Sequence, residues 1–316
     1  MHQSRLQELV RGWLHRPLLR RAERAGRIAL SPLQYLRRRH LARELLAGRP
    51  AALHLDPGLG YARFGPGALG GSEELLSLAQ AELARLRPRL ERPAEGRRGA
   101  RQLVEELGSD ALLAREPRFV EFALSDEVVR PVLEYLGEVP FLARISLALS
   151  RPLAAAAEPV HFQRFHVDND DLRHVKLYLN AQEVAARHGP LCFLPARTSE
   201  RVLRALAREG KHLGPASSFS DEEVFRHCER DELVELEGSR ASGAFVDLSR
   251  CLHYGSRVAA AEERLQLVLV FLRRHRLHEN ASSQIAPPAG QDELRALLLD
   301  PPRRHPPGFF FPESVA

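Results

Sequence analysis

The stretch QRFHVDNDDLRHVKLYLN, residues 163–180, carries the side chains of this sequence that are best placed for chemistry. His166 and Asp168 are two residues apart, and residues with that spacing in a β-strand point to the same face. One imidazole and one carboxylate then face a common point. His253 is the candidate for a second imidazole, and two histidines with one carboxylate hold non-haem Fe(II) while leaving coordination positions open. A His-x-Asp pair is weak evidence alone, because roughly half of one is expected by chance in this composition.

The context of the pair strengthens the interpretation. Residues 174–180 alternate strictly between polar and apolar types, which predicts a strand with one polar face. The polar face would carry His174, Lys176, Tyr178 and Asn180. A strand of this kind in a barrel indicates an interior that holds a polar ligand. Lys176 stands out, because lysine occurs only at 176 and 211 and the other 44 of the 46 basic residues are arginine.

The second half of the candidate site lies in FVDLSRCLHYGSR, residues 245–257, where a strand ends in a turn that presents His253. Eleven residues later Arg264 begins the apolar strand RLQLVLVF. An arginine at the polar end of such a strand meets solvent or binds an anion inside. A guanidinium binds a carboxylate in bidentate fashion, which suits a dicarboxylate.

The motifs QRFHVDNDD, KLYLN, HGPLCFLPA and CLHYGSR, followed by Arg264, resemble the phytanoyl-CoA dioxygenase family of Fe(II)/2-oxoglutarate oxygenases. The resemblance covers residues 140–275, and the spacing of 87 residues between His166 and His253 is typical of that family. One departure is residues 195–198, which read PART where family members commonly have PGSH, so that the loop near the substrate entrance can differ.

The resemblance implies a function and a role for each residue. His166, Asp168 and His253 would bind the iron, and Arg264 would hold the distal carboxylate of 2-oxoglutarate, with Lys176 and Tyr178 lining the cosubstrate pocket. 2-Oxoglutarate and O₂ would be converted to succinate and CO₂ while a small organic substrate is oxidised. The related halogenases have Gly or Ala in place of Asp168, so its presence favours hydroxylation, desaturation or ring formation. The acyl-CoA substrate does not transfer, because no CoA-specific signature is present.

The elements that position these residues fall into two groups. Helices are expected within residues 4–47, broken near Pro17 and Pro32, and then at 72–90, near 100–115 and at 126–136, the last between a Ser125 cap and a Gly137 stop. A Gly- and Pro-rich loop with a short strand at 51–55 is expected within 49–71. Strands are expected at 141–150, 160–165, 175–179, 191–194, 244–248 and 265–272.

These elements predict an α+β fold built on a double-sheet barrel. The resemblance implies that this barrel is a double-stranded β-helix, also called a jelly roll and similar to cupins. Residues 1–137 would form an N-terminal helical layer, 138–280 the catalytic core with a helical insertion at about 199–231, and 281–316 a tail, all in one structural domain. The insertion contains Ser220 and Glu223 at capping-box spacing. The tail would carry a helix at 292–299 and a Phe-rich end, residues 309–311, that packs back on the body.

Composition limits the other classes of function. The net charge of +5 comes from 46 basic and 41 acidic residues that alternate along the chain, which indicates a mixed solvated surface rather than a nucleic-acid site. Three cysteines far apart favour a reducing cytoplasm over a disulfide framework, with Cys192 and Cys251 as small packed side chains. No apolar run approaches the roughly 20 residues of a membrane span.

Three alternatives remain open. A cupin-like metal protein or Zn²⁺ hydrolase could use the same three ligands without 2-oxoglutarate, since His and carboxylate also satisfy zinc. A binding module that lost turnover and a nucleic-acid binder are the others. The remaining histidines in and around the core would be surface or supporting groups: His161, His174, His188, His212 and His227. The identity of the substrate and the oligomeric state are not encoded in any motif.

Overall fold

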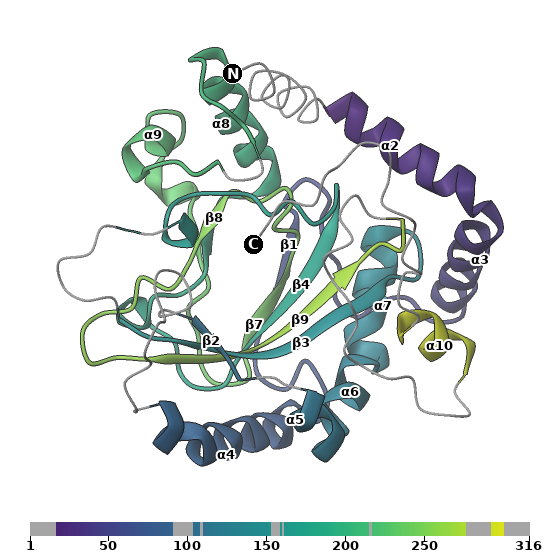
Figure 1. Cartoon of the computed structure of the whole chain (residues 1–316), viewed down its shortest axis with the longest axis horizontal. Coiled ribbons are helices and arrows are strands. Elements are labelled where there is room, and N and C mark those ends of the chain that lie inside the picture. Colours follow the sequence, from purple (N-terminus) through teal and green to yellow (C-terminus); the bar gives the residue numbers. More distant parts are fainter. Residues whose placement is uncertain are drawn as a thin grey trace, which may run out of the picture.

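A six-stranded antiparallel sheet forms the centre of the molecule (Figure 1). The computed structural model describes residues 17–90, 104–107, 110–152, 159, 161–214, 217–275 and 292–299. The strand order of the major sheet is β1-β7-β4-β9-β3-β2. Its strands are β1 (Tyr61–Phe64), β2 (Val104–Glu106), β3 (Phe141–Ser150), β4 (His174–Asn180), β7 (Gly243–Val246) and β9 (Arg264–Leu272).

The two faces of the major sheet differ as the alternation of β4 predicts. Val175, Leu177 and Leu179 are fully buried and belong to the main hydrophobic core, together with Leu269 of β9 and Leu147 of β3. The register brings them together, because Leu177 pairs with Leu269 and Leu147 pairs with Leu267 of the same strand. The opposite face of β4 carries its polar side chains toward the inside of the barrel.

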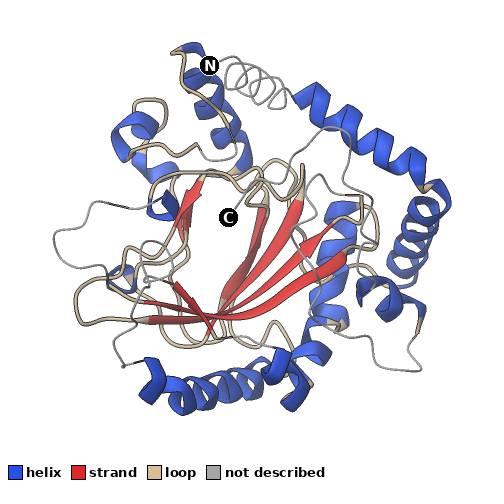
Figure 2. Ribbon diagram, in the orientation of Figure 1, coloured by secondary structure: helices blue, strands red, loops and turns tan. Residues whose placement is uncertain are grey.

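A smaller antiparallel sheet in the order β6-β5-β8 faces the major sheet (Figure 2). Its strands are β6 (Val234–Glu235), β5 (Cys192–Phe193) and β8 (His253–Tyr254). An isolated antiparallel bridge between His166 and His253 adds a further segment at the edge of β8. The α+β fold with a jelly-roll core that the sequence predicts is therefore confirmed.

Helices cover the outer face of the major sheet, and two more flank the smaller sheet (Figures 1 and 2). The first group is α4 (Ser72–Leu90), α5 (Asp110–Arg115), α6 (Arg118–Ala123), α7 (Asp126–Leu136) and α10 (Glu293–Leu299). Farther out, α3 (Pro32–Gly48) packs on α7, and α2 (Pro17–Leu30) packs on α3. The second is α8 (Ala196–Arg208) and α9 (Asp221–Phe225), which pack through Val202, Leu206 and Val224. Among the described residues, no helix has both the length and the apolar character needed to cross a bilayer.

Arg38 of α3 joins the helical layer to the sheet. Its side chain is fully buried, and its guanidinium donates to the carbonyls of Val139 and Pro140, both at 3.0 Å, and of Leu297 at 2.8 Å. The chain just before β3 and the end of α10 are thus held by one side chain. Buried cations are stable only when their donors are satisfied in this way.

Several expected boundaries are confirmed. The helix stop at Gly137 has the left-handed φ of 70° that favours glycine, and Ser220 and Glu223 form the predicted capping box at the start of α9. Residues 4–16 of the expected N-terminal helices and residues 309–311 of the expected Phe-rich end lie outside the described part of the chain.

Other expectations were wrong. No strand forms at 51–55; the strand of this loop is β1, whose partner is β7. Of the strand expected at 160–165, the described residues 161–165 do not form a strand but contain a short 3₁₀ turn, His161–Gln163, followed by bridges at Phe165 and His166. The helix expected near 100–115 is confirmed only at α5, and the described residues before it include the strand β2. These elements are set by strand partners distant in the sequence, which a local pattern does not reveal.

Candidate metal centre

His166, Asp168 and His253 lie together between the two sheets. One ligand atom from each falls within 4.8 Å of the other two, so the three can hold one metal ion. The main chain positions them: the N–H groups of His166 and His253 each donate to the other residue's carbonyl at 2.9 Å, and the N–H of Asp168 donates to Leu248 at 2.9 Å. The predicted group is therefore brought together, although on bridged segments and not on one regular strand.

Both histidines are oriented by a backbone carbonyl. His166 Nδ1 lies 2.9 Å from the carbonyl oxygen of Arg164, and His253 Nδ1 lies 3.0 Å from that of Cys251. A carbonyl only accepts, so each Nδ1 carries the proton and each Nε2 is the nitrogen that can bind a metal. Burial, reinforced by the neighbouring His166, lowers the pKa of His253 to about 3. His253 is thus neutral at physiological pH, as a metal ligand must be.

Asp168 is held ionised chiefly by the ammonium of Lys176. The Nζ of Lys176 lies 2.6 Å from Asp168 Oδ2, and His174 Nε2 lies 3.4 Å from the same oxygen. Burial acts to raise the pKa of Asp168, but the Lys176 ammonium and the neighbouring imidazoles outweigh it and keep that pKa well below its usual range. Asp168 therefore offers a carboxylate and not a carboxylic acid.

Asp247, at the end of β7, supports the turn that presents His253. Its side chain is fully buried and accepts hydrogen bonds from the hydroxyl of Tyr135 at 2.7 Å and from the N–H of Ser249 at 3.1 Å. Its carbonyl accepts from the N–H of Cys251 at 2.9 Å. The sequence analysis missed this residue; an Asp two residues before a Ser at a strand end is the local signal of such a turn.

Arg264 begins β9 and is buried inside the barrel, with 5% of its surface exposed. Its guanidinium donates to the carbonyl of Gly189 and lies 3.1 Å from the hydroxyl of Ser150 and 3.3 Å from that of Ser256. Burial lowers the pKa of Arg264 to about 10, which leaves the side chain charged at neutral pH. Within the described residues no carboxylate pairs with it, and its Nε has no hydrogen-bond partner.

Gly189 shapes the contact with Arg264. Its φ is +58°, and a Cβ at this position would lie 2.5 Å from the carbonyl carbon of Arg257. Both facts require glycine here, because other residues rarely adopt this conformation and no space remains for a side chain. The HGP turn of the sequence thus brings a backbone carbonyl against the buried guanidinium.

Tyr178 lies on the inward face of β4 between the two ends of the site. Burial raises the pKa of Tyr178, and its hydroxyl experiences the charges of Lys176, Asp168 and Arg264. The residues expected near the cosubstrate are therefore close enough to interact electrostatically. Lys176 contacts Asp168 directly, and its place in the cosubstrate pocket stays a prediction.

His174 was expected as a surface or supporting group, and the structure places it in the interior beside Asp168. Its side chain is fully buried, and neither ring nitrogen makes a hydrogen bond with any described residue beyond the long 3.4 Å approach to Asp168. With Asp168 and Asp170 it forms a second group that can hold a metal ion. His188 is also buried, at 6% exposure, whereas Cys192 and Cys251 are the buried free thiols that the sequence predicts.

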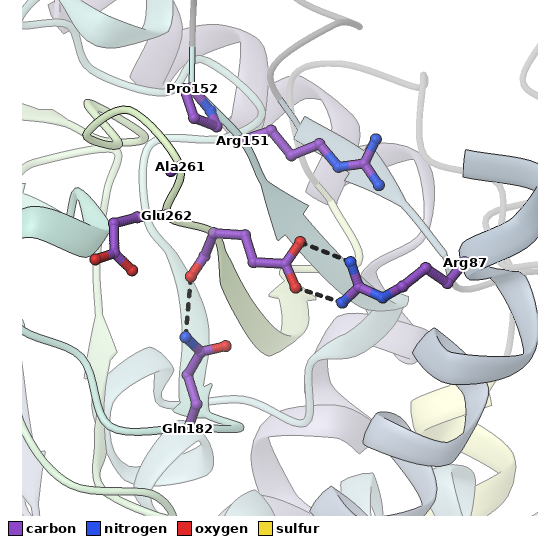
Figure 3. Close-up of a pocket in the computed structure, with 7 residues that line it drawn as sticks. Arg87, Arg151, Pro152, Gln182, Ala261 and Glu262 are labelled. Carbon is purple, nitrogen blue, oxygen red and sulfur yellow. Dashed lines mark hydrogen bonds and ion pairs between the residues drawn. The ribbon is translucent and has the colours of Figure 1, made fainter. Parts of the chain in front are cut away.

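A separate cavity of about 530 Å³ lies away from these residues (Figure 3). Much of its charged lining is already paired: Arg87 binds Glu263, and Glu262 lies 3.3 Å from Arg187, which is outside the lining. Gln182 donates to the carbonyl of Glu263 at 2.9 Å, which closes the same cluster. A ligand here would compete with existing ion pairs, so the cavity is a weaker candidate than the centre between the sheets.

The chain is similar in structure to several solved enzymes. The epimerase SnoN from nogalamycin biosynthesis, described as a non-heme alpha ketoglutarate dependent enzyme, has a TM-score of 0.47 and 15% identity over 74% of this chain and 84% of its own. HygX from Streptomyces hygroscopicus, with nickel and 2-oxoglutarate bound, has a TM-score of 0.46 and 15% identity over 68% of this chain and 83% of its own. EctD from S. alaskensis, with 2-oxoglutarate and 5-hydroxyectoine, has a TM-score of 0.46 and 14% identity over 71% of this chain and 83% of its own. No protein-family model and no curated protein matches the sequence.

Proposed function

We propose that this chain is an Fe(II)/2-oxoglutarate-dependent oxygenase of the phytanoyl-CoA dioxygenase type that oxidises a small organic molecule. His166, Asp168 and His253 would hold the iron. Two neutral imidazoles and one carboxylate fit Fe(II), and three protein ligands leave three positions for a bidentate 2-oxo acid and for oxygen. The bound iron would supply the reductive activation of O₂ that is coupled to conversion of 2-oxoglutarate to succinate and CO₂.

The buried guanidinium of Arg264 is the observation that carries the proposal. Burying a cation without a carboxylate partner costs folding free energy. Such a cation is tolerated at a site where an anionic ligand binds and neutralises it. The distal carboxylate of 2-oxoglutarate matches that requirement, since guanidinium and carboxylate form two parallel hydrogen bonds. A zinc hydrolase that uses the same ligands has no need for such a cation, so Arg264 favours the oxygenase.

Other residues of the chain would then orient the metal ligands and the cosubstrate. The carbonyls of Arg164 and Cys251 keep the two imidazoles in the tautomer that presents Nε2. Arg264 orients the cosubstrate from the far end, and Tyr178 forms part of the wall between it and the metal ligands. The two sheets around the site exclude bulk water, which strengthens these interactions.

Hydroxylation is the proposed outcome for the substrate. A carboxylate at position 168 occupies the place that a halide takes in the related halogenases, which leaves oxygen transfer as the favoured reaction. The substrate would enter beside the insertion of α8 and α9, because loops and insertions around a rigid barrel vary in shape and set specificity.

An anaerobic titration tests the proposal directly. The metal-free protein is titrated with Fe(II) and then with 2-oxoglutarate, and the visible metal-to-ligand charge-transfer band is recorded. We expect the band in the wild type, its loss in His166→Ala, and a higher 2-oxoglutarate requirement in Arg264→Ala. Arg63→Ala is the control, because Arg63 is exposed and donates to the carbonyl of Glu237.

Two outcomes would reject the oxygenase. One is a wild-type protein that forms no band, and the other is a band unchanged in both His166→Ala and Arg264→Ala. Binding of Zn²⁺ without any effect of 2-oxoglutarate would support the hydrolase instead.

A further inference from the structure

We infer that Lys176 and His174 together hold the outer oxygen of Asp168, so that this carboxylate binds the metal through one oxygen and a coordination position stays open. The inference rests on the proposed function and concerns the same site. It assigns Lys176 to the carboxylate ligand and not to the cosubstrate. Both residues are positioning residues, since they would act through Asp168.

The two oxygens of Asp168 have different surroundings. Oδ2 faces Lys176 Nζ at 2.6 Å and His174 Nε2 at 3.4 Å. Oδ1 faces the other way, with His253 Nε2 at 3.8 Å. Oδ1 is thus the oxygen nearer His253, while the Lys176 ammonium and the His174 ring lie beside Oδ2, which accepts no hydrogen bond of regular geometry from the described residues.

The main chain of both positioning residues is fixed by strand pairing. They occupy alternate positions of β4 in the middle of the major sheet, where Lys176 pairs with Val246 on one side and Val270 on the other. His174 pairs with Leu272, and its side chain is fully buried. A buried imidazole whose nitrogens have no other partner among the described residues is best satisfied by the carboxylate oxygen beside it.

The number of oxygens that Asp168 supplies decides how many ligands the metal can add. With one oxygen from Asp168, three of six positions remain, two for the 2-oxo acid and one for oxygen. If Oδ2 also bound the metal, only two positions would remain. The 2-oxo acid would fill both of them, and no position would be left for oxygen. Outer partners of metal ligands commonly set this geometry.

A second metal ion at Asp168, Asp170 and His174 is the competing interpretation of the same cluster. It would have to share Oδ2 with the Lys176 ammonium, which already lies 2.6 Å away. A metal ion on the same oxygen would be a close neighbour of this ammonium, and neighbouring cations repel each other in a buried site. The cluster is therefore better explained by a carboxylate in an ion pair with Lys176 than by two metals.

Spectroscopy of the metal-loaded protein tests the inference without turnover. Co(II) is used as the probe, because its d–d absorption reports coordination number, and nitric oxide binding to the Fe(II)·2-oxoglutarate protein reports the open position. The variants are Lys176→Met, His174→Leu and His174→Gln. The control is Lys211→Met, which removes the chain's other lysine at an exposed pair with Glu223.

We expect Lys176→Met and His174→Leu to shift the Co(II) spectrum toward higher coordination and to weaken nitric oxide binding by about 10- to 100-fold. The 2-oxoglutarate dissociation constant should change by less than about threefold, within the context dependence of such partners. His174→Gln retains a donor and should resemble the wild type, as should Lys211→Met. Circular dichroism identifies any variant that fails to fold. If a His174 variant does not fold, the inference is tested with Lys176→Met.

Three results would overturn the inference. An unchanged Co(II) spectrum in Lys176→Met with much weaker 2-oxoglutarate binding would return Lys176 to the cosubstrate pocket. Two Co(II) ions bound per chain would favour the second metal site, and wild-type behaviour in all variants would remove any positioning role. These outcomes require a wild type that binds metal and 2-oxoglutarate; a wild type that binds neither would reject the proposed function, and this inference with it.

Discussion

His166 and His253, 87 residues apart in the sequence, are joined by two main-chain hydrogen bonds of 2.9 Å, one in each direction. Their rings lie 4.1 Å apart between centroids. The separation of the two imidazoles is thus set by backbone pairing and does not depend on a metal. A preorganised site of this kind binds its ion without first ordering the chain.

Metal binding should stabilise the fold, because the folded state alone assembles the three ligands. At a free metal concentration of 100 times its dissociation constant, Co(II) should raise the free energy of unfolding by about 2.7 kcal/mol. Chemical denaturation with and without a chelator measures the effect. His253→Ala should lose the stabilisation, whereas His54→Ala, at an exposed position, should keep it. Equal stabilisation of both variants would place the metal elsewhere.

Arg264→Met should separate stability from ligand binding. Removing a buried guanidinium that lacks a carboxylate partner should leave the stability of the ligand-free protein unchanged or higher. Affinity for 2-oxoglutarate should fall by about 10- to 100-fold, since a charged hydrogen bond contributes about 1.5–3 kcal/mol. Isothermal titration calorimetry and denaturation measure the two quantities. A large loss of stability with normal affinity would show that Arg264 is structural.

Gly189→Ala should displace the carbonyl that accepts from Arg264. The new Cβ meets the backbone of Arg257, and the positive φ adds strain, so we expect a loss of about 1–3 kcal/mol in unfolding free energy. Binding of 2-oxoglutarate should weaken as well. Gly210→Ala is a matched control, because its φ of +80° imposes similar strain while nothing lies within 4 Å of the added Cβ. If both variants weaken 2-oxoglutarate binding equally, the carbonyl contact is not the cause.

Acid should lower the stability of the helical insertion by protonating Glu223. The hydrogen bond from Lys211, followed by that from the N–H of Ser220, lowers the pKa of Glu223 from 4.5 to about 2. A carboxyl whose pKa is lower in the folded state stabilises the protein above its unfolded pKa and loses that contribution as pH falls through its folded pKa. The stability advantage of wild type over Glu223→Gln should therefore narrow between pH 4.5 and about 2.

Denaturant midpoints measured across that range in both proteins check the effect on Glu223. Glu222→Gln, at the exposed neighbouring position, is the control and should show no comparable narrowing. An advantage that stays constant on acidification would contradict the assignment.

Much of the fold follows from local patterns. The alternation of residues 174–180 predicts β4 and its polar inner face, and Ser220 with Glu223 predicts the start of α9. The strand at residues 61–64 was missed and one at 51–55 was wrongly expected. An edge strand as short as β1 is stabilised by its pairing with β7, and that partner lies about 180 residues further along.

The sequence by itself determined which chemistry is possible, because His, Asp and Arg at these spacings carry the donors that a metal and a dicarboxylate require. The metal and cosubstrate roles of these residues stay predictions. Only the tertiary structure decided how the groups are used: which oxygen of Asp168 meets Lys176, that His174 is buried beside it, and that Arg264 has no carboxylate partner among the described residues. Such relationships depend on strand register and burial, which arise between segments far apart in the chain.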